Sequence, residues 1–337
     1  MRFIDNIGQI DSFQWEDLLA ASATRSFFQT RACYDFYAAN PSFMEAFCFA
    51  VEQAHCLKGV IVGYIQRDGG RLKQFLSRRA IINGGPLLAA DISGECLAFL
   101  LDNCRRSLKD KAIYVESRNF EDFSSYREVF ERSGFRYEPH LNFHIDTSTA
   151  DAVEEHLGKS RKRDIKLSLR DGAQIVENPS LEEVRGFYAL LRELYRTRVK
   201  TPLFPLSFFE RLYERPEARF LLVRYAEKIV GGTVCVCLPG YAVYEWFACG
   251  EDGVYKNIHP STLATYAGIL YAAQHGFSHF DMMGAGKPDD AYGVREFKAK
   301  FGGKQIEYGR FLSVLKPLLY QTGRLGVKLM KCIPVKK

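Results

Sequence analysis

The residues best suited to chemistry in this chain lie in one stretch, from Phe280 to Gly303. The segment HFDMM is typical of the end of a buried strand, and it leads into a loop rich in glycine, proline and aspartate. A short basic helix, VREFKAKF, follows and is ended by two glycines. A strand that ends in a glycine-rich polar loop before a helix is a common position for a ligand site. The alternative is a plain connection, and the charged residues gathered here favour a site: Asp281, Lys287, Arg295, Lys298 and Lys300.

Positive charge is concentrated in the second half of the chain. Residues 1–150 contain 17 Lys and Arg against 19 Asp and Glu, whereas residues 151–337 contain 29 against 21. A basic half favours an anionic partner such as a phosphate, a nucleic acid or a lipid headgroup. The alternative is a set of solvated lysines without a partner.

Length and composition limit the fold class and the compartment. With 337 residues, 47% hydrophobic and 26% charged, the chain is typical of a soluble globular protein with two domains. No apolar run approaches the roughly 20 residues that span a bilayer, and the N-terminus lacks the apolar core of a signal peptide. Nine scattered cysteines without a CxxC pair indicate neither zinc nor a disulfide framework. We therefore expect a cytoplasmic protein without a bound metal.

The first half is predicted to alternate helices with strands. Helices are expected from Trp15 to Ala21, over SFFQTRACYDFYAAN and from Ser93 to Leu108, and strands over FMEAFCFAVE, LKGVIVGYIQRD and RLKQFLSRRAIING. Asp68-Gly69-Gly70 suits a hairpin turn. The strand KAIYVES, a helix ended by Gly134 and the strand FRYEPHLNFHIDT complete this half.

The second half repeats this order of elements. A charged helix from Ala152 to Leu169 and an amphipathic helix over LEEVRGFYALLRELYRTRV precede three strands, a helix capped by Ser261, the strand FSHFDMM, the basic helix and a final strand, KQIEYGRFLSVL. We therefore predict an α+β protein with two similar domains, 1–150 and 151–314, and a boundary near residues 147–151. We expect the segment 315–337 to pack onto the first domain. The alternative is that it lies on the surface of the inner membrane.

Several stretches resemble the Fem family of aminoacyl-tRNA-dependent peptidyltransferases, whose fold is a tandem acetyltransferase-type (GNAT) domain. They are SFFQTRACYDF, GKSRKRDIKLSLRDGAQIVE, FYALLRELYRTR, YEWFACG and the stretch from FDMMGAG to VREFKAKFGG. The helix pattern of the family is present as Phe297-Lys298 and Phe301-Gly302, whereas its Asp-Phe-Gly-Gly strand end is replaced by the sequence DMMG, residues 281–284. The resemblance covers residues 12–313. It implies two mixed, mostly antiparallel sheets flanked by helices, without the coiled-coil insertion of some members.

The resemblance implies transfer of an amino acid from aminoacyl-tRNA to an amine of a peptidoglycan-precursor peptide or a related envelope substrate. The acceptor is then an anionic peptide or a nucleotide-sugar peptide, and no cofactor is implied. Catalysis of such a transfer depends on placing the reactants and stabilising the oxyanion. Lys298 is the implied cation beside the carbonyl, Phe297 offers a backbone carbonyl to the amine, and Asp281 orients Lys298 or caps the strand end. We expect Tyr244, Asp281 and Lys298 to face one cavity.

Other residues are candidates for substrate binding. Guanidinium groups suit diphosphates and carboxylates, and the family has an arginine near Arg196 and Arg198, of which we favour Arg198. Tyr244 and Trp246 share a face of the fourth strand by alternation, either in the groove or in the core. Lys287 lies in the loop itself.

A basic stripe lies on the first helix of the second half. It consists of Arg161, Lys162, Arg163 and Lys166, with Arg170 further along the helix. These residues either follow the phosphates of a tRNA acceptor arm or form a solvated helix face.

Two other functions compete with aminoacyl transfer. A CoA-dependent N-acyltransferase needs successive backbone amides for the pyrophosphate after the fourth strand. The chain has no glycine between Asn257 and Thr262, and Pro260 lacks an amide, which disfavours acetyl-CoA or acyl-CoA. The non-enzyme alternative is a duplicated scaffold that only binds peptide or RNA.

Overall fold

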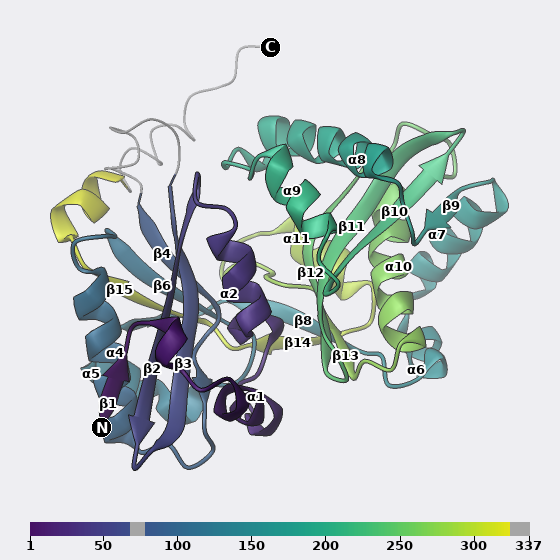
Figure 1. Ribbon diagram of the computed structural model, residues 1–337. Helices are drawn as coiled ribbons and strands as arrows, with labels where there is room; N and C mark the ends of the chain where they lie inside the picture. Colours follow the sequence, from purple (N-terminus) through teal and green to yellow (C-terminus); the bar gives the residue numbers. More distant parts are fainter. Residues whose placement is uncertain (68–77, 324–337) are drawn as a thin grey trace. The chain divides into compact units, whose positions relative to one another are not determined.

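The computed structural model describes residues 1–67 and 78–323, which form two compact units (Figure 1). Unit 1 is Met1–Pro139 together with the chain from Tyr308 onward, and unit 2 is His140–Glu307. The predicted hairpin turn at residues 68–70 and the last part of the C-terminal segment, 324–337, lie outside the described residues. Each unit is a mixed β-sheet with helices packed against it, which confirms the predicted α+β class.

Unit 1 has a sheet with the strand order β1-β2-β3-β4-β6-β15-β7, and β5 pairs with β3. Its strands are antiparallel apart from the parallel pair β4 and β6. The strands are β1 Arg2–Ile4, β2 Met44–Gln53, β3 Cys56–Gln66, β4 Arg79–Gly84, β5 Leu87–Leu88, β6 Tyr114–Asn119, β7 Arg136–Glu138 and β15 Arg310–Val314. The helices are η1 Ile7–Gln9, α1 Ser12–Ala21, η2 Phe27–Gln29, α2 Arg31–Ala38, α4 Gly94–Leu108, η3 Ser124–Tyr126 and α5 Arg127–Arg132.

The described part of the C-terminal segment belongs to unit 1. Leu315 packs against the core of this unit, and residues 317–323 are helical. The ring of Tyr320 meets the ring of Tyr114 edge-on, with 5.4 Å between the centroids. For these residues the structure therefore favours packing onto the first domain, the alternative we expected.

Unit 2 has a sheet with the strand order β14-β8-β13-β12-β11-β10-β9, in which β12 and β13 are the parallel pair. The strands are β8 Leu141–Asp146, β9 Gln174–Val176, β10 Ala218–Tyr225, β11 Lys228–Leu238, β12 Ala242–Gly250, β13 His279–Asp281 and β14 Lys304–Glu307. The helices are α6 Ala150–His156, α7 Lys159–Arg170, α8 Leu181–Leu194, the π-helix η4 Tyr195–Val199, α9 Leu206–Tyr213, α10 Pro260–Gln274 and α11 Gly293–Ala299.

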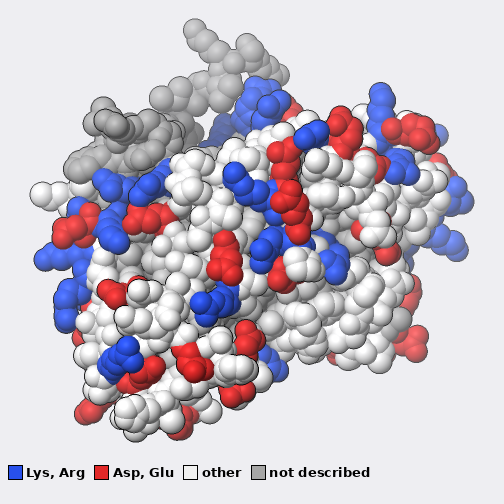
Figure 2. All heavy atoms as spheres, in the orientation of Figure 1, with Lys and Arg blue, Asp and Glu red and all other residues white. Residues whose placement is uncertain are grey.

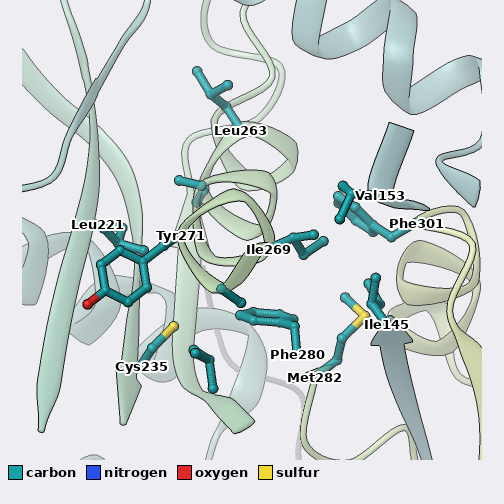
Figure 3. Packing of buried hydrophobic residues seen from close by; sticks show 14 of the residues in the cluster. Ile145, Val153, Leu221, Cys235, Leu263, Ile269, Tyr271, Phe280, Met282 and Phe301 are labelled. Atoms are coloured by element: carbon teal, nitrogen blue, oxygen red, sulfur yellow. The ribbon is translucent and has the colours of Figure 1, made fainter. Parts of the chain in front are cut away.

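The core of unit 2 is built around α10, which packs on β10, β11 and β12. This helix is apolar on almost every side, and most of its residues are buried, because α6 and α7 cover the side that faces away from the sheet. Figure 3 shows Ile269 of α10 in one cluster with Phe280 and Met282 from the end of β13 and with Phe301. The segment that carries the predicted site is therefore anchored in the core by its apolar residues.

Two predicted strands are each divided between the units, and this moves the predicted domain boundary. The segment FRYEPHLNFHIDT forms β7 in unit 1 and β8 in unit 2, because Pro139 interrupts it and has no amide for a ladder. Likewise KQIEYGRFLSVL forms β14 and β15, and Gly309 between them has a φ of +63°. The units thus divide after Pro139 and after Glu307, rather than near residues 147–151 and at residue 314.

Two predicted helices are shorter than the sequence indicated. The helix expected from Ala152 to Leu169 is divided into α6 and α7 at Gly158, whose amide donates to the carbonyl of Lys300 at 3.1 Å. The helix expected over residues 26–40 is a 3-10 turn, η2, followed by α2, and the Thr30 side chain caps α2 by accepting the Cys33 amide. At Gly158 and at Thr30, the hydrogen bond just described takes the place of a main-chain bond that would continue one helix through the position.

Candidate active site

The parallel strands β12 and β13 separate where the predicted site begins. Their pairing ends at Tyr244 and Asp281, yet β12 continues to Gly250. Within the described residues, no strand pairs with β12 on this side beyond that point. In unit 1 the parallel strands β4 and β6 remain paired to the last residue of each. The sheet of unit 2 alone therefore opens here, between β12 and the loop that follows β13.

A β-bulge on β12 changes which side chains face this opening. The pairing with β11 shifts between Phe247 and Glu245, so Trp246 is an extra residue opposite β11. The predicted alternation of Tyr244 and Trp246 therefore does not hold. Tyr244 is fully buried at the last pair of the ladder, whereas the Trp246 ring packs 5.4 Å from the ring of Phe208 on α9. The structure places Trp246 in an aromatic cluster with α9.

Asp281 caps the end of β13. Its Oδ1 accepts hydrogen bonds from the Asn142 side chain at 2.7 Å and from the Met283 amide at 2.6 Å, and its Oδ2 lies 3.1 Å from His144 Nε2. Burial raises the pKa of this carboxyl, but the neighbouring His144 and these hydrogen bonds outweigh burial and lower the pKa below its ordinary value. Of the two predicted roles, the contacts support capping of the strand end.

Lys298 holds the turn that follows Asp281. Its ammonium group donates to the carbonyl of Met282, to the carbonyl of Met283 at 2.7 Å and to the carbonyl of Gly284 at 2.9 Å. An ammonium group has three N–H donors, and all three are used here. The side chain is buried, with 7% of the residue exposed. Lys298 is therefore a tie between α11 and the turn, and none of its hydrogens is left for an oxyanion in this conformation.

The packing of α11 does not follow the apolar spacing of Val294, Phe297 and Phe301, which would place these three side chains on the inner face of the helix. Phe301 is buried, Phe297 is half-buried and Val294 is 41% exposed. Lys298 is buried instead, because the carbonyls of the turn after Asp281 satisfy its charge. An apolar spacing on a short helix did not reveal that a lysine occupies the inner face.

Arg295 extends the same arrangement along the loop. Its Nε donates to the carbonyl of Ala285 at 3.0 Å, its Nη1 to that of Pro288 at 3.0 Å and its Nη2 to that of Lys287. Arg295 and Lys298 are three residues apart and together bind carbonyls from Met282 to Pro288. The side chain of Lys287 itself is exposed.

Glu245 is a buried carboxylate that the sequence did not indicate as part of a site. It lies on β12 directly after Tyr244 with 7% of its surface exposed, and its Oε1 accepts from Thr265 at 2.8 Å and from Thr233 at 3.4 Å. Burial raises the pKa of Glu245 and nearby Lys298 lowers it, while burial lowers the pKa of Lys298 and nearby Glu245 raises it. Burial is the larger effect in both cases, so the pKa of Glu245 is raised and that of Lys298 is lowered, and each group partly offsets the effect of burial on the other. A charged residue inside the apolar run AVYEWFACG was the signal that could have indicated it.

Arg161 is buried, which fits neither a contact with tRNA phosphates nor a solvated helix face. Its Nη1 donates to Thr262 Oγ1 at 2.9 Å and its Nη2 to the Phe297 carbonyl at 3.4 Å. The guanidinium lies 4.4 Å from the ring centroid of Phe297. Because α7 turns this residue toward α10 and α11, Arg161 joins three helices, and it also engages the carbonyl that was expected to meet an amine.

The other members of the predicted stripe, Lys162, Arg163 and Lys166, are exposed on α7. Arg163 also pairs with Asp164 at 2.9 Å. On the face of the molecule shown in Figure 2, basic and acidic side chains are intermixed. In the described parts of the chain, the helices are too short or too polar to cross a membrane.

Arg196 and Arg198 differ in their contacts. Both are exposed in η4, but Arg196 donates two hydrogen bonds to Glu193, at 2.9 Å and 2.7 Å. Arg198 has no partner among the described residues. Tyr195 at the start of η4 has a pKa raised by burial and by nearby Cys249 and Tyr292, and Tyr292 precedes α11. The π-helix therefore lies near the start of α11, with Arg198 available for an anion.

The N-terminus of α10 is poorly suited to the pyrophosphate of a CoA. Pro260 has no amide hydrogen, and the Ser261 amide donates to the carboxylate of Asp252 at 3.1 Å. A Cβ on Gly250 would lie 2.4 Å from the Ser261 nitrogen, so the end of β12 is already packed against the start of this helix. An anionic group at this helix start would face the negative charge of Asp252.

Comparison with known proteins identifies the fold. Residues 155–298 match the family model described as "Acetyltransferase (GNAT) domain". The whole chain is similar to the crystal structure of FemX, with a TM-score of 0.71, 14% identity and coverage of 96% of this chain and 99% of that chain. It is also similar to a tandem GNAT protein from the clavulanic acid biosynthesis pathway, with a TM-score of 0.60, 13% identity and coverage of 93% of this chain and 98% of that chain. The similarity to L-PGS from Bacillus licheniformis has a TM-score of 0.55, 13% identity and coverage of 94% of this chain and 96% of that chain. None of the curated proteins compared matches the sequence. The chain therefore has the tandem GNAT fold, and its predicted likeness to the Fem type is confirmed at the level of fold.

Proposed function

We propose that this tandem GNAT protein transfers an amino acid from aminoacyl-tRNA to an amine of a peptidoglycan-precursor peptide or a related envelope substrate. The observation that carries the proposal is the start of α10, where Asp252 already binds the Ser261 amide. A GNAT fold whose helix start disfavours a CoA pyrophosphate can use another activated acyl donor. An aminoacyl ester is such a donor, and it needs no pyrophosphate cradle.

The opening between β12 and the loop after β13 supports a role in placing the ester. Asp281 and Lys298 fix the turn from Met282 to Gly284 beside this opening. A fixed polar turn can stabilise charge that develops in the transition state without reorganising. Lys298 thus acts through the turn that it holds.

Exposed cations of unit 2 supply the contacts that the two anionic substrates require. Arg198 is the candidate for a phosphate or carboxylate of the acceptor, because its guanidinium is exposed and unpaired among the described residues. Lys162, Arg163 and Lys166 are the candidates for tRNA phosphates. Lys287 remains a candidate for the acceptor, since its side chain is exposed on the loop.

A transfer assay on the purified protein tests the proposal. Total tRNA charged with labelled amino acids is incubated with UDP-muramyl pentapeptide, and a parallel reaction contains labelled acetyl-CoA with the same acceptor. We expect label in the peptide from aminoacyl-tRNA alone. Acetylation of the peptide would support the CoA alternative, and stable binding of peptide or tRNA without transfer would support the scaffold alternative.

A further inference from the structure

We propose that the backbone N–H of Gly284 is the oxyanion donor of this transfer, and that Lys298 activates it through the Met283–Gly284 peptide bond. The inference rests on the proposed function for its substrate, but the turn geometry carries it independently. It explains how Lys298 can contribute to catalysis although it is buried and all three of its N–H groups donate to main-chain carbonyls.

Lys298 binds the carbonyls of three consecutive peptide units, and the amide of each unit points the opposite way. A trans peptide is planar, with its C=O and N–H antiparallel, and the described residues contain no cis peptide bond. The amide of the first unit, Met283 N–H, donates to Asp281. The amide of the third, Ala285 N–H, donates to the Leu141 carbonyl at 2.6 Å. The amide of the middle unit, Gly284 N–H, donates to none of the described residues.

The turn is loosely packed around Gly284. Gly284 is half-buried, and the nearest atom to a Cβ built on it is His140 Nε2 at 3.7 Å. Met283 and Gly284 have φ values of +47° and +64°, so two successive residues are left-handed. Backbone amides near such residues form concave sites for anions, and here the Gly284 amide is the one without an acceptor among the described residues.

A cation on the carbonyl strengthens the amide of the same peptide unit. Hydrogen bonds in a chain polarise one another, and the effect is larger in a site of low dielectric constant. Lys298 Nζ lies 2.7 Å from the Met283 oxygen, so the Met283–Gly284 unit is polarised at its carbonyl end. Removal of one oxyanion donor costs about 10²–10³-fold in kcat in a well-studied protease.

The transfer balances without a further reagent. The acceptor amine attacks the ester carbonyl carbon and a C–N bond forms. The carbonyl oxygen becomes an oxyanion, which accepts a hydrogen bond from the Gly284 N–H. Collapse of this intermediate breaks the C–O bond to the ribose. The ribose oxygen takes the proton that the amine nitrogen loses.

Arg295 and Gly286 provide a matched comparison within the same loop. Arg295 Nε binds the Ala285 carbonyl at 3.0 Å, and the Gly286 amide of that peptide unit has no acceptor among the described residues. Loss of Lys298 should therefore affect the Gly284 amide, and loss of Arg295 should affect the Gly286 amide.

Selective labelling makes the proposed amide visible in the full-length protein. Met283-Gly284 is the only Met-Gly pair in the sequence, so carbonyl-13C methionine with 15N glycine yields one correlation. Carbon-detected spectra of the wild type should show this correlation shifting at alkaline pH as Lys298 loses its proton. Lys298→Met should move it at neutral pH, and Arg295→Met should leave it nearly unchanged. The proposal would be overturned if neither alkaline pH nor Lys298→Met moved the correlation. It would also be overturned if the Gly284 amide were as protected from hydrogen exchange as the amides within β12.

The transfer assay separates this inference from the proposed function. We expect Lys298→Met to lower kcat by about 100-fold with KM changed by less than about threefold. If the wild type transfers no amino acid, the proposed function fails and the spectra still decide whether Lys298 polarises the amide. If the wild type transfers and Lys298→Met keeps more than a third of its kcat, the inference fails alone.

Discussion

Asp281 and Lys298 hold the same turn through opposite groups. The Asp281 carboxylate accepts the Met283 amide, and the Lys298 ammonium donates to the carbonyls of Met282, Met283 and Gly284. Both charged groups are buried, and Glu245 lies close enough to shift the pKa of Lys298 upward against the effect of burial. The site is thus a buried set of charges organised around main-chain atoms.

Loss of Lys298 should destabilise the protein. Lys298→Ala leaves three carbonyls without a donor and Glu245 without its compensating charge, so we expect a loss of about 3–5 kcal/mol in the free energy of unfolding. Urea unfolding measures the change. Lys300→Ala is the control, because Lys300 is exposed two residues further on, and it should differ little from the wild type. Equal effects of the two changes would contradict the burial of Lys298.

Glu245 and Lys298 should be energetically coupled. In a double-mutant cycle with Glu245→Gln and Lys298→Met, the double variant should lose about 1–3 kcal/mol less than the two single losses together. The reason is that each single change leaves one buried charge uncompensated. The same cycle with Lys300→Met in place of Lys298→Met should give coupling near zero. Additive losses for the first pair would mean that the two charges do not interact.

Stability should fall as the pH drops from 6.5 toward 4. Burial and the neighbouring His144 lower the pKa of His279 from 6.5 to about 4. In this window the unfolded chain binds more protons than the folded chain, so the free energy of unfolding rises with pH. The contribution is complete above pH 6.5 and is as much as about 3 kcal/mol. Denaturation curves at several pH values should be flatter for His279→Gln than for the wild type; an unchanged slope would assign the dependence to other groups.

Arg198 should affect acceptor binding more than Arg196 does. Arg198→Ala is expected to raise KM for UDP-muramyl pentapeptide by about tenfold with little change in kcat, because the guanidinium would bind the acceptor equally in the ground and transition states. Arg196→Ala should have a small effect, because Glu193 already pairs with Arg196. Steady-state kinetics of the two variants decide the point. A larger effect at Arg196 would reverse the assignment.

Binding of tRNA should depend on the exposed residues of α7. The double change Lys162→Glu and Lys166→Glu should weaken tRNA binding. It should also reduce the slope of the logarithm of the binding constant against the logarithm of the salt concentration, by about 0.9 for each phosphate that is no longer neutralised on a duplex. Filter binding between about 50 and 200 mM salt measures the slope. Arg161→Met is the contrast: since Arg161 is buried between helices, this change should lower stability and leave the slope unchanged in the folded fraction. Identical slopes for wild type and the Lys162 and Lys166 variant would place tRNA elsewhere.

Several features of the site followed from local sequence patterns. The strand end at Asp281, the loop after it and the helix around Lys298 were located correctly, because apolar strands, glycine-rich loops and helix-ending glycines are signalled by neighbouring residues. Pro260 likewise indicated that the start of α10 has one amide fewer for a pyrophosphate. The family resemblance added the importance of Lys298, which spacing alone did not supply.

Which residues are buried and bonded in the site depended on contacts between distant segments. Lys298 and Arg161 resemble surface cations in the sequence, but one meets carbonyls 14 to 16 residues earlier and the other meets a threonine 101 residues later. Glu245 was passed over because its threonine partners lie on two other elements. No local pattern records such partners.

The sequence by itself determined the α+β class and the repeated order of elements, because apolar periodicity and turn residues act over a few positions. The tertiary structure alone decided that β8 joins the second sheet and β15 the first, although each continues a strand-like pattern begun in the other unit. It also decided that the sheet opens after Tyr244 and Asp281 and that a buried lysine fixes the turn there. These outcomes depend on pairing between strands far apart in sequence and on the cost of burying a charge without partners, and a linear pattern expresses neither.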